Sequence, residues 1–164
     1  MKHRLESLMQ SDTQGILDAI RRIVKSLRRA SKLSEKKMGL SSAQLFVLQK
    51  IAESDSPLSV NDLAARTLTH QSSVSVVVKK LEKKMLIERQ PSESDARAVE
   101  LRICKKGTLL LRGAPPLIQK QLMDGITLLS KSERQGLVIG LRALIEKAGL
   151  QEEEPSLFFE DSKG

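Results

Sequence analysis

The predicted fold depends on residues 71–103, QSSVSVVVKKLEKKMLIERQPSESDARAVELRI, because the spacing of apolar residues changes once within this stretch. Over residues 71–85, apolar side chains recur at helical spacing, which predicts a helix with one inward face. The predicted inward residues are Val74, Val77, Val78, Leu81 and Met85. Over residues 97–103, apolar and polar side chains alternate instead, as in a half-buried strand. Residues 87–89 can pair with this strand, and the turn formers at 90–96 predict a hairpin with a protruding polar loop.

The chain before this stretch predicts two further helices in close succession. Ser41 and Ser59 each stand three residues before a Gln or an Asp, which is the spacing of a helix N-cap. The predicted elements are a helix over about 42–53, a turn at 54–57, a helix over about 60–66 and a turn at 67–70. Together with the next helix they form a helix-turn-helix, and the hairpin that follows is a wing.

Longer helical segments flank these elements on both sides. The first is expected from about residue 12, behind a capping pattern that begins at Ser11, to the mid-thirties. The last two are expected over about 105–129, kinked or interrupted by Pro115-Pro116, and over about 131–148. The predicted fold class is therefore mainly α with a small β-hairpin wing.

Charge is distributed unevenly along the chain. The net charge is +8, but residues 151–164 carry five acidic residues against Lys163 alone, so the first 150 residues hold +12. A basic body indicates a polyanionic partner, most often nucleic acid, although basic surfaces also occur on proteins that bind no anion. With three Phe and no Trp or Tyr, the composition argues against modules that stack bases on exposed rings.

Other classes of protein find little support in the sequence. The single cysteine, Cys104, excludes an internal disulfide and a paired-cysteine metal clip. His3 and His70 lack the spacing of a nucleophile, base or metal ligand, so we expect no enzyme, no cofactor and no metal. The polar start and the lack of a long apolar run predict neither a signal peptide nor a membrane span. We therefore expect a cytoplasmic protein with no membrane partner.

The outward face of the predicted helix 71–85 suits contact with a nucleic-acid duplex. Small side chains near its start permit close approach to base edges and thymine methyls, and its lysines fall where phosphates would lie. The candidate contact residues on this helix are Ser72, Ser73, Ser75, Val76, Lys79 and Lys80. An ordinary amphipathic helix with solvated lysines has the same pattern, so both interpretations stay open on this evidence. Serine and valine at an exposed helix start cost helix propensity, which favours the groove-facing interpretation.

Residues 40–111 resemble the DNA-binding core of the MarR family of bacterial transcriptional regulators. The most specific part is Asp95-Ala96-Arg97, before an alternating strand and Gly107, which is similar to the family's wing signature. Residues 77–89 resemble the end of the family's recognition helix, and the flanking helices match in number and order. The resemblance implies that Arg97 reaches the minor groove, whose negative potential attracts an arginine, and that Asp95 braces either the loop or Arg97. Otherwise the two residues form a surface ion pair of little energy.

Three residues depart from the family pattern. Met85 stands where the family commonly has glycine, which puts the turn after the recognition helix in question. Val76 occupies a position that is often polar or arginine in the family, and it affects the sequence preference. Cys104 replaces the usual threonine cap of the next helix, and we interpret it as a buried or semi-buried structural thiol.

The resemblance also implies an obligate homodimer in which the terminal helices intertwine. The expected dimerisation residues are Ile16, Ile20, Ile23, Val24, Leu27, Leu141, Leu144 and Ile145. The expected divisions of the chain are an N-terminal dimerisation helix (1–38), a winged helix-turn-helix DNA-binding core (39–107), C-terminal dimerisation helices (108–150) and an acidic tail (151–164).

The resulting hypothesis is a sequence-specific regulator that binds double-stranded DNA and represses transcription until a small-molecule effector relieves it. The recognition helix 71–85 would enter the major groove of an inverted-repeat operator, and the wing at 90–97 would lie at the minor groove. Lys79, Lys80 and Arg89 would contact phosphates. The alternative is a winged-helix protein-interaction module whose basic first helix docks an acidic partner, or an architectural DNA-binding module without a specific operator.

Overall fold

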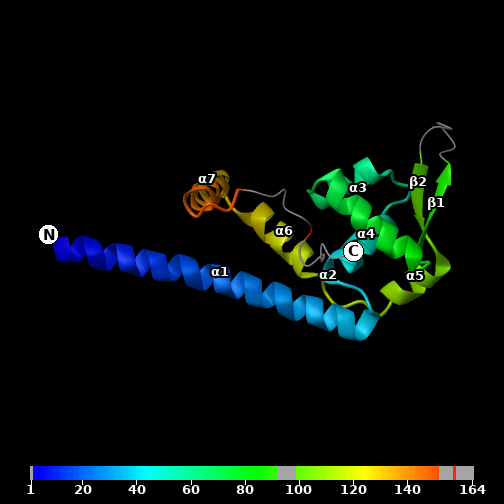
Figure 1. Cartoon of the computed structure of the whole chain (residues 1–164), viewed down its shortest axis with the longest axis horizontal. Coiled ribbons are helices and arrows are strands. Elements are labelled where there is room, and N and C mark those ends of the chain that lie inside the picture. The colour runs from blue at the N-terminus through cyan, green and yellow to red at the C-terminus, as the bar shows by residue number, and fades with distance from the viewer. Residues whose placement is uncertain (1, 92–98, 152–156, 158–164) are drawn as a thin grey trace.

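A computed structural model describes residues 2–91, 99–151 and 157, with side chains from Gln10 onward. The elements in chain order are α1 (Lys2–Met38), α2 (Ser42–Ala52), α3 (Val60–Thr67), α4 (Gln71–Lys83), β1 (Ile87–Pro91), β2 (Val99–Ile103), α5 (Lys105–Leu111), α6 (Ile118–Leu128) and α7 (Lys131–Lys147). The predicted fold class, mainly helical with a small antiparallel hairpin, is confirmed. Figure 1 shows α2 to α5 and the hairpin gathered at one end, while α1 extends away as one long helix.

Helices α2, α3 and α4 form the hydrophobic core because each carries an apolar face that the other two cover. The Ser41 hydroxyl caps α2 by accepting the Gln44 N–H at 3.1 Å, and Ser59 and Asp62 form a complete capping box on α3. Helix α4 packs against both α2 and α3. The fully buried side chains of these helices include Leu45, Val47, Leu48, Leu63, Val74, Val77, Val78 and Leu81. The inward face predicted for α4 is therefore confirmed for its two turns of valine and leucine.

The turn after α4 corrects the prediction for Met85. The helix ends at Lys83, before Met85, whose backbone is left-handed (φ 58°) and whose side chain is 67% exposed. The Leu86 N–H donates to the Leu81 carbonyl at 3.1 Å, which closes the helix and lets Leu86 enter the core in place of Met85. Because glycine is the residue that adopts this backbone without steric cost, the departure at Met85 falls on a strained position.

The hairpin pairs β1 with β2 in antiparallel register from Ile87 opposite Ile103 to Pro91 opposite Val99. Strand β1 is longer than predicted, because Gln90 and Pro91, which the turn formers at 90–96 assign to a loop, pair with β2 in the ladder. Leu58 extends this small sheet by a two-bond bridge, in which its carbonyl accepts the Leu101 N–H at 2.8 Å. Residues 92–98, most of the predicted wing loop, lie outside the described residues.

The segment predicted as one helix over 105–129 consists of two helices, α5 and α6. They are separated at 112–117 because Pro115 and Pro116 lack the N–H that a continuing helix requires. Gly107 lies where α5 passes the end of α4, and a Cβ at this position would collide with the Leu86 carbonyl oxygen. Glycine is therefore required there by close approach of the backbone.

The terminal helices differ from prediction at one end. Helix α1 begins at Lys2 and passes through the capping pattern at Ser11, which therefore does not start a helix. The residues before Ser11 include good helix formers and no Pro or Gly, so nothing interrupts the helix there. Helix α7 begins as predicted at a complete Ser130–Glu133 capping box.

The flanking helices join the core at few points. Helix α1 contacts α2 and α6, and the Ser42 hydroxyl donates to the Gln119 side-chain oxygen at 3.0 Å in a buried position. Residues 130–151, which include all of α7, are exposed. None of the described helices is long and apolar enough to cross a membrane.

Candidate nucleic-acid interface

Helix α4 presents its outward face to solvent. Val74, Val77, Val78 and Leu81 fix the orientation of the helix by packing inward. On the other side, Ser72, Val76 and Lys79 are exposed, with 44% of Val76 accessible. Ser73, Ser75 and Lys80 are half-buried at the edges of this face. The six candidates on α4 therefore share one side of a helix whose opposite side is held by the core.

The start of α4 is open to an anion. His70 is the N-cap residue but makes no side-chain capping bond, and the first turn of the helix contains no acidic residue. The first N–H groups of a helix lack partners within the helix and carry a partial positive charge. This end of α4 can therefore receive a phosphate without displacing a carboxylate.

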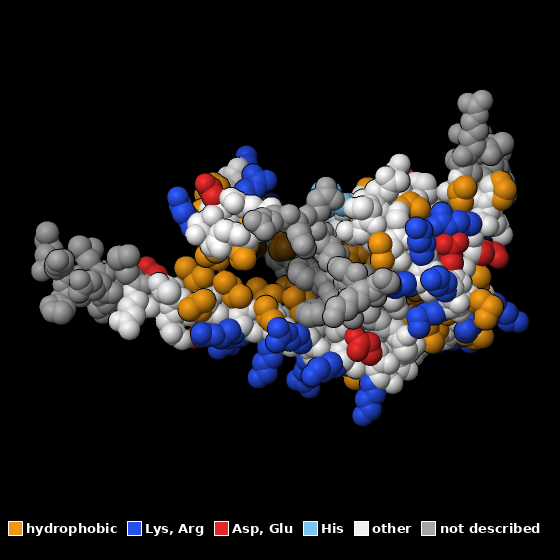
Figure 2. Space-filling view, viewed as in Figure 1, with side chains coloured by type: hydrophobic (Ala, Val, Ile, Leu, Met, Phe, Trp, Pro, Cys, Tyr) orange, Lys and Arg blue, Asp and Glu red, His pale blue; other side chains and the backbone are white. Residues whose placement is uncertain are grey.

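Two lysines near the end of α4 support the turn at Met85. The Lys84 amine donates to the Gly39 carbonyl at 3.1 Å, and the Lys106 amine donates to the Lys84 carbonyl at 2.9 Å. Neither contact is visible in the sequence, because no periodicity or spacing marks a lysine that binds a distant carbonyl. Figure 2 shows cationic side chains gathered beside the hairpin and, separately, along one edge of α1.

Arg89, a predicted phosphate contact, lies on β1 and pairs with an acidic residue of α4. Its Nε is 2.8 Å from a Glu82 carboxylate oxygen, and both side chains remain partly accessible. Such a surface pair contributes little stability, because water competes for both partners. The pair orients Arg89 beside α4 and leaves an arginine that a phosphate could engage by exchange with Glu82. Asp95 and Arg97, the other two candidates, lie outside the described residues.

The surroundings of Cys104 are those of a structural thiol. It is the N-cap of α5, is half-buried and makes no capping bond, as expected when cysteine replaces threonine. Burial, together with the nearby Glu88 carboxylate, raises the pKa of the Cys104 thiol. The thiol therefore stays protonated at neutral pH and is a weak nucleophile. Among the residues that the structure describes, no cluster of His, Cys, Asp or Glu could hold a metal ion.

The predicted dimerisation residues fall into three groups. Ile16, Ile23, Leu141, Leu144 and Ile145 are exposed. Ile20 and Val24 are half-buried, and Leu27 is already buried within the single chain. Leu27 therefore has little surface left for a second subunit, whereas the other residues leave an apolar face on α1 and another on α7.

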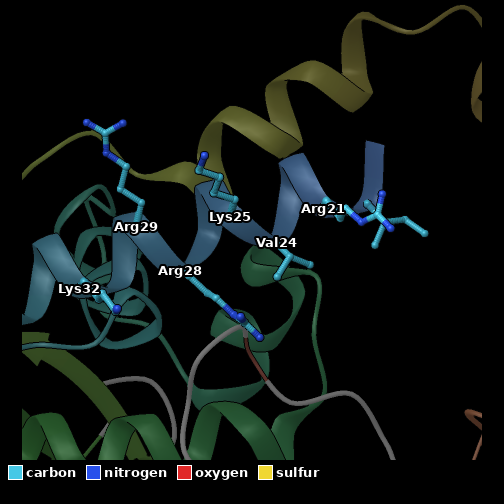
Figure 3. Close-up of a pocket in the computed structure, with 7 residues that line it drawn as sticks. Arg21, Val24, Lys25, Arg28, Arg29 and Lys32 are labelled. Carbon is cyan, nitrogen blue, oxygen red and sulfur yellow. The ribbon is translucent and has the colours of Figure 1, made fainter. Parts of the chain in front are cut away.

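A hollow of about 610 Å³ lies on α1 and is lined by this helix alone. Its floor contains Ile20 and Val24, and its lining cations are Arg21, Lys25, Arg28, Arg29 and Lys32. In Figure 3, Lys25 and Arg29 project to one side of the helix and Arg28 and Lys32 to the other. Because a single helix cannot enclose a cavity, another segment must cover the hollow before it could retain a small ligand.

A helix-turn-helix followed directly by an antiparallel hairpin defines a winged helix-turn-helix protein. Residues 38–98 match the model of the MarR family, so this part of the chain is similar to that family. The curated relatives that the chain matches are named as transcriptional regulators.

Two curated relatives come from Bacillus subtilis (strain 168). The HTH-type transcriptional repressor MdtR is 34% identical over 76 residues, which are 46% of this chain and 48% of that protein. The match thus spans about half the length of MdtR. The uncharacterized HTH-type transcriptional regulator YfiV is 24% identical over 139 residues, which are 85% of this chain and 86% of that protein.

Solved structures agree on the fold. The transcriptional regulator BldR from Sulfolobus solfataricus has a TM-score of 0.54 at 26% identity, with 83% of this chain and 96% of that chain covered. The S. aureus MepR–DNA complex has a TM-score of 0.55 at 19% identity, with 79% and 95% covered. The second similarity, at that identity, concerns the fold alone.

Proposed function

We propose that the chain acts as a homodimer that binds an inverted-repeat operator in double-stranded DNA and regulates transcription. The observation that carries the proposal is the outward face of α4, where small side chains precede exposed lysines on a helix fixed from behind by the core. The DNA-bound MepR neighbour, which has the same fold, supports it.

Contacts to DNA divide between α4 and the hairpin. Ser72, Ser73, Ser75 and Val76 meet base edges in the major groove, because their short side chains allow the helix to approach closely. Lys79, Lys80 and Arg89 bind phosphates, the last by exchanging its Glu82 partner. Arg97 enters the minor groove and Asp95 orients it.

The exposed apolar faces of α1 and α7 support the homodimer. Leu141, Leu144 and Ile145 are 40–46% exposed on one side of α7, and apolar faces of this kind mark interfaces. A two-fold dimer places its two recognition helices about 34 Å apart, in successive major grooves. In this arrangement residues 1–38 and 108–150 form the dimer, residues 39–107 bind DNA and residues 151–164 form an acidic tail.

Repression relieved by a small molecule is the regulatory part of the proposal. MdtR is named a repressor, and a structural neighbour, Bordetella bronchiseptica BpsR, is described as regulated by 6-hydroxynicotinic acid. An effector can release DNA only by binding better to a dimer with the wrong spacing of recognition helices.

The first test is selection of fragmented genomic DNA by the purified protein at physiological salt, followed by sequencing of the retained fragments. An enriched inverted repeat with half-sites one helical turn apart is expected. Retention without a shared sequence would favour the architectural alternative, and no retention would favour a protein-interaction module with an acidic partner.

The second test is Arg97→Ala, with the exposed Arg112→Ala as its matched control. Arg97→Ala is expected to weaken operator binding by about 10- to 100-fold and to leave the dimer intact in sedimentation. Unchanged operator affinity in Arg97→Ala would overturn the minor-groove assignment.

A further inference from the structure

The side of α1 that faces away from the core is lined by arginine and lysine. Leu27, Ser31 and Ser34 are buried, and they fix the inward side of this helix. Because an α-helix has 3.6 residues per turn, a second set of residues lies on the opposite side of α1. This set, which we call the cationic stripe, consists of Arg22, Lys25, Arg29, Lys32 and Lys36, all exposed.

The stripe stays accessible in the proposed homodimer. The apolar residues of α1 that we assign to the interface lie on the same side of the helix as the buried Leu27, and they are Ile16, Ile20, Ile23 and Val24. Figure 2 shows cationic side chains along the edge of α1 that points away from the other helices, apart from those beside the hairpin. The stripe is therefore separate both from the dimer interface and from the outward face of α4.

The acidic residues of α1 do not neutralise the stripe. Asp18 pairs with Arg21, outside the stripe, at 2.8 Å, and the Glu35 carboxylate accepts a hydrogen bond from the Ser31 hydroxyl at 2.8 Å. Among the side chains that the structure describes, no ion pair involves a cation of the stripe. Cations three or four residues apart on a helix repel one another, so the stripe costs α1 stability. A polyanion bound along the stripe would remove this repulsion.

The composition of the stripe favours a nucleic-acid backbone over a polypeptide or a membrane. Protein interfaces are anchored by buried aromatic and apolar side chains, but α1 contains no Phe, Trp or Tyr, and between Arg22 and Lys36 only Leu33 borders the stripe. A helix that binds a membrane surface inserts its apolar side, which in α1 is turned towards the core. Phosphates, in contrast, require only cations.

The length of the stripe also suits a DNA duplex. The 14 residues from Arg22 to Lys36 extend over about 21 Å of helix. A duplex carries about one phosphate per 1.7 Å of its axis, so a segment of this length offers more phosphates than the stripe has cations.

We propose that the cationic stripe of α1 is a second site for double-stranded DNA, which binds phosphates without reading sequence. In the homodimer, the outward faces of α4 hold the operator and the stripe holds a second duplex segment, so one dimer bridges two stretches of DNA. Binding at the stripe is independent of the proposed function, whereas bridging from an operator rests on it.

Binding at the stripe is located by acetylation of lysines, since an amine bound to a phosphate is shielded from the reagent. The probe is an excess of a duplex of arbitrary sequence, about 30 bp long, at about 50 mM salt. Lys25, Lys32 and Lys36 should react at least about threefold more slowly with the duplex than without it. The exposed Lys131 and Lys147 of α7 are the controls and should keep their rates. Unchanged rates at the three lysines of the stripe would overturn the proposal.

The same experiment reports on α4 separately. Slower acetylation of the exposed Lys79 and Lys83 is the result expected from the proposed function, and its absence would count against that function alone. Protection confined to these two lysines would overturn the site on α1.

Bridging is measured by capture of a labelled duplex of arbitrary sequence on protein already bound to an immobilised operator. K25Q/R29Q/K32Q should lower this capture by about tenfold or more, and the slope of log K against log salt for this step should fall by about two to three. The matched control, K131Q/R142Q/K147Q, removes the same charge from α7 and should change capture by less than about twofold.

Two outcomes of the capture experiment would contradict the proposal. Equal losses in the two variants would indicate long-range charge and overturn the site on α1. A wild-type dimer that captures no second duplex, although the lysines of the stripe are protected, would overturn bridging and assign the stripe to the flank of a single duplex. If no operator exists, the proposed function fails, and acetylation still decides whether the stripe binds DNA.

Discussion

The winged-helix core and α7 are both rich in leucine, isoleucine and valine, yet these side chains are buried in the core and exposed in α7. In α4, every apolar side chain on the inward face is fully buried. In α7, no residue is buried, although the helix carries Leu137, Val138, Leu141, Leu144 and Ile145 on one side. The core therefore completes its own apolar contacts, whereas α7 offers an apolar face to something outside the single chain.

This difference separates two sources of stability. A fully buried leucine or valine contributes about 1.5–3 kcal/mol relative to its exposed state, and the core contains many. A helix of the length of α7 is only marginally stable alone in water, even with a good N-cap. We therefore expect the core to fold within one chain and α7 to be stabilised by association.

The largest effect is expected from charges on the apolar side of α7. The double substitution Leu141→Glu and Ile145→Glu should weaken self-association about 1,000-fold, because two carboxylates would have to be buried in the interface. Analytical ultracentrifugation measures the change. Ile139→Glu is the matched control, since Ile139 lies on the opposite side of α7 and is 69% exposed. Equal dissociation in the control would remove the distinction between the two sides of the helix.

A substitution that leaves a cavity in the core should lower the free energy of unfolding and leave self-association unchanged. Leu81→Ala is expected to lower the free energy of unfolding by about 3 kcal/mol, because Leu81 is completely buried. Leu128→Ala, at a position 86% exposed, should change it by less than about 0.5 kcal/mol. Urea unfolding of both variants, at a fixed protein concentration, provides the comparison. Similar losses in the two would contradict the division between self-contained and open regions.

Relief of strain at the turn after α4 should stabilise the core. Met85→Gly is expected to raise the free energy of unfolding by up to about 1 kcal/mol, because glycine adopts the left-handed backbone without a Cβ clash. Lys83→Gly is the control, since Lys83 is exposed, ends α4 in helical backbone and gains nothing from glycine. Thermal unfolding followed by circular dichroism measures both, and a destabilised Met85→Gly would show that the turn carries no strain.

Removing either of the two complete capping boxes should have a smaller effect, and the property that changes should depend on which region contains the box. Ser59→Ala in α3 should cost the core about 1 kcal/mol, whereas Ser130→Ala in α7 should act mainly through self-association. Urea unfolding and sedimentation of the two variants separate these effects. If Ser130→Ala lowered core stability as much as Ser59→Ala, the two regions would unfold as one unit.

Acid provides a second measurement on the same cap. Hydrogen bonds from the Ser59 hydroxyl and backbone N–H lower the pKa of Asp62 below its usual value. A lowered folded-state pKa stabilises the fold above about pH 4, and this contribution is lost as the pH falls through that pKa. Stability measured between neutral and acid pH should therefore fall less steeply in Ser59→Ala than in the wild type. Identical pH dependence would exclude the hydrogen bond from the Ser59 hydroxyl as a cause of the lowered pKa of Asp62.

The core was predictable because signals within a few residues agree with one another. The Ser41 and Ser59 caps and the valine spacing in α4 all lie within the helices that they define, and the structure confirms them. The end of α4 was mispredicted because it depends on Leu86 taking the core position that the helical period assigned to Met85. The start of α1 was mispredicted because a local capping pattern has no effect when the chain before it stays helical.

In the candidate interface, too, only features set by local periodicity could be predicted from the sequence. The outward face of α4 follows from the inward one by periodicity alone. The Arg89–Glu82 pair and the Lys84–Gly39 contact join separate elements, so no local pattern could have revealed them. The roles of Asp95 and Arg97 rest on the resemblance and remain a prediction, because these residues lie outside the described residues.

The hydrogen bond between Ser42 and Gln119 has a consequence for the order of folding. Its two residues are 77 positions apart, whereas α2, α3 and α4 contact their near neighbours in sequence. Contacts between distant residues form slowly, because a long loop must close before they provide any stabilisation. During synthesis, residues 40–103 are added to the chain before Gln119. We therefore expect the winged helix to form first and α6 to dock onto a finished surface.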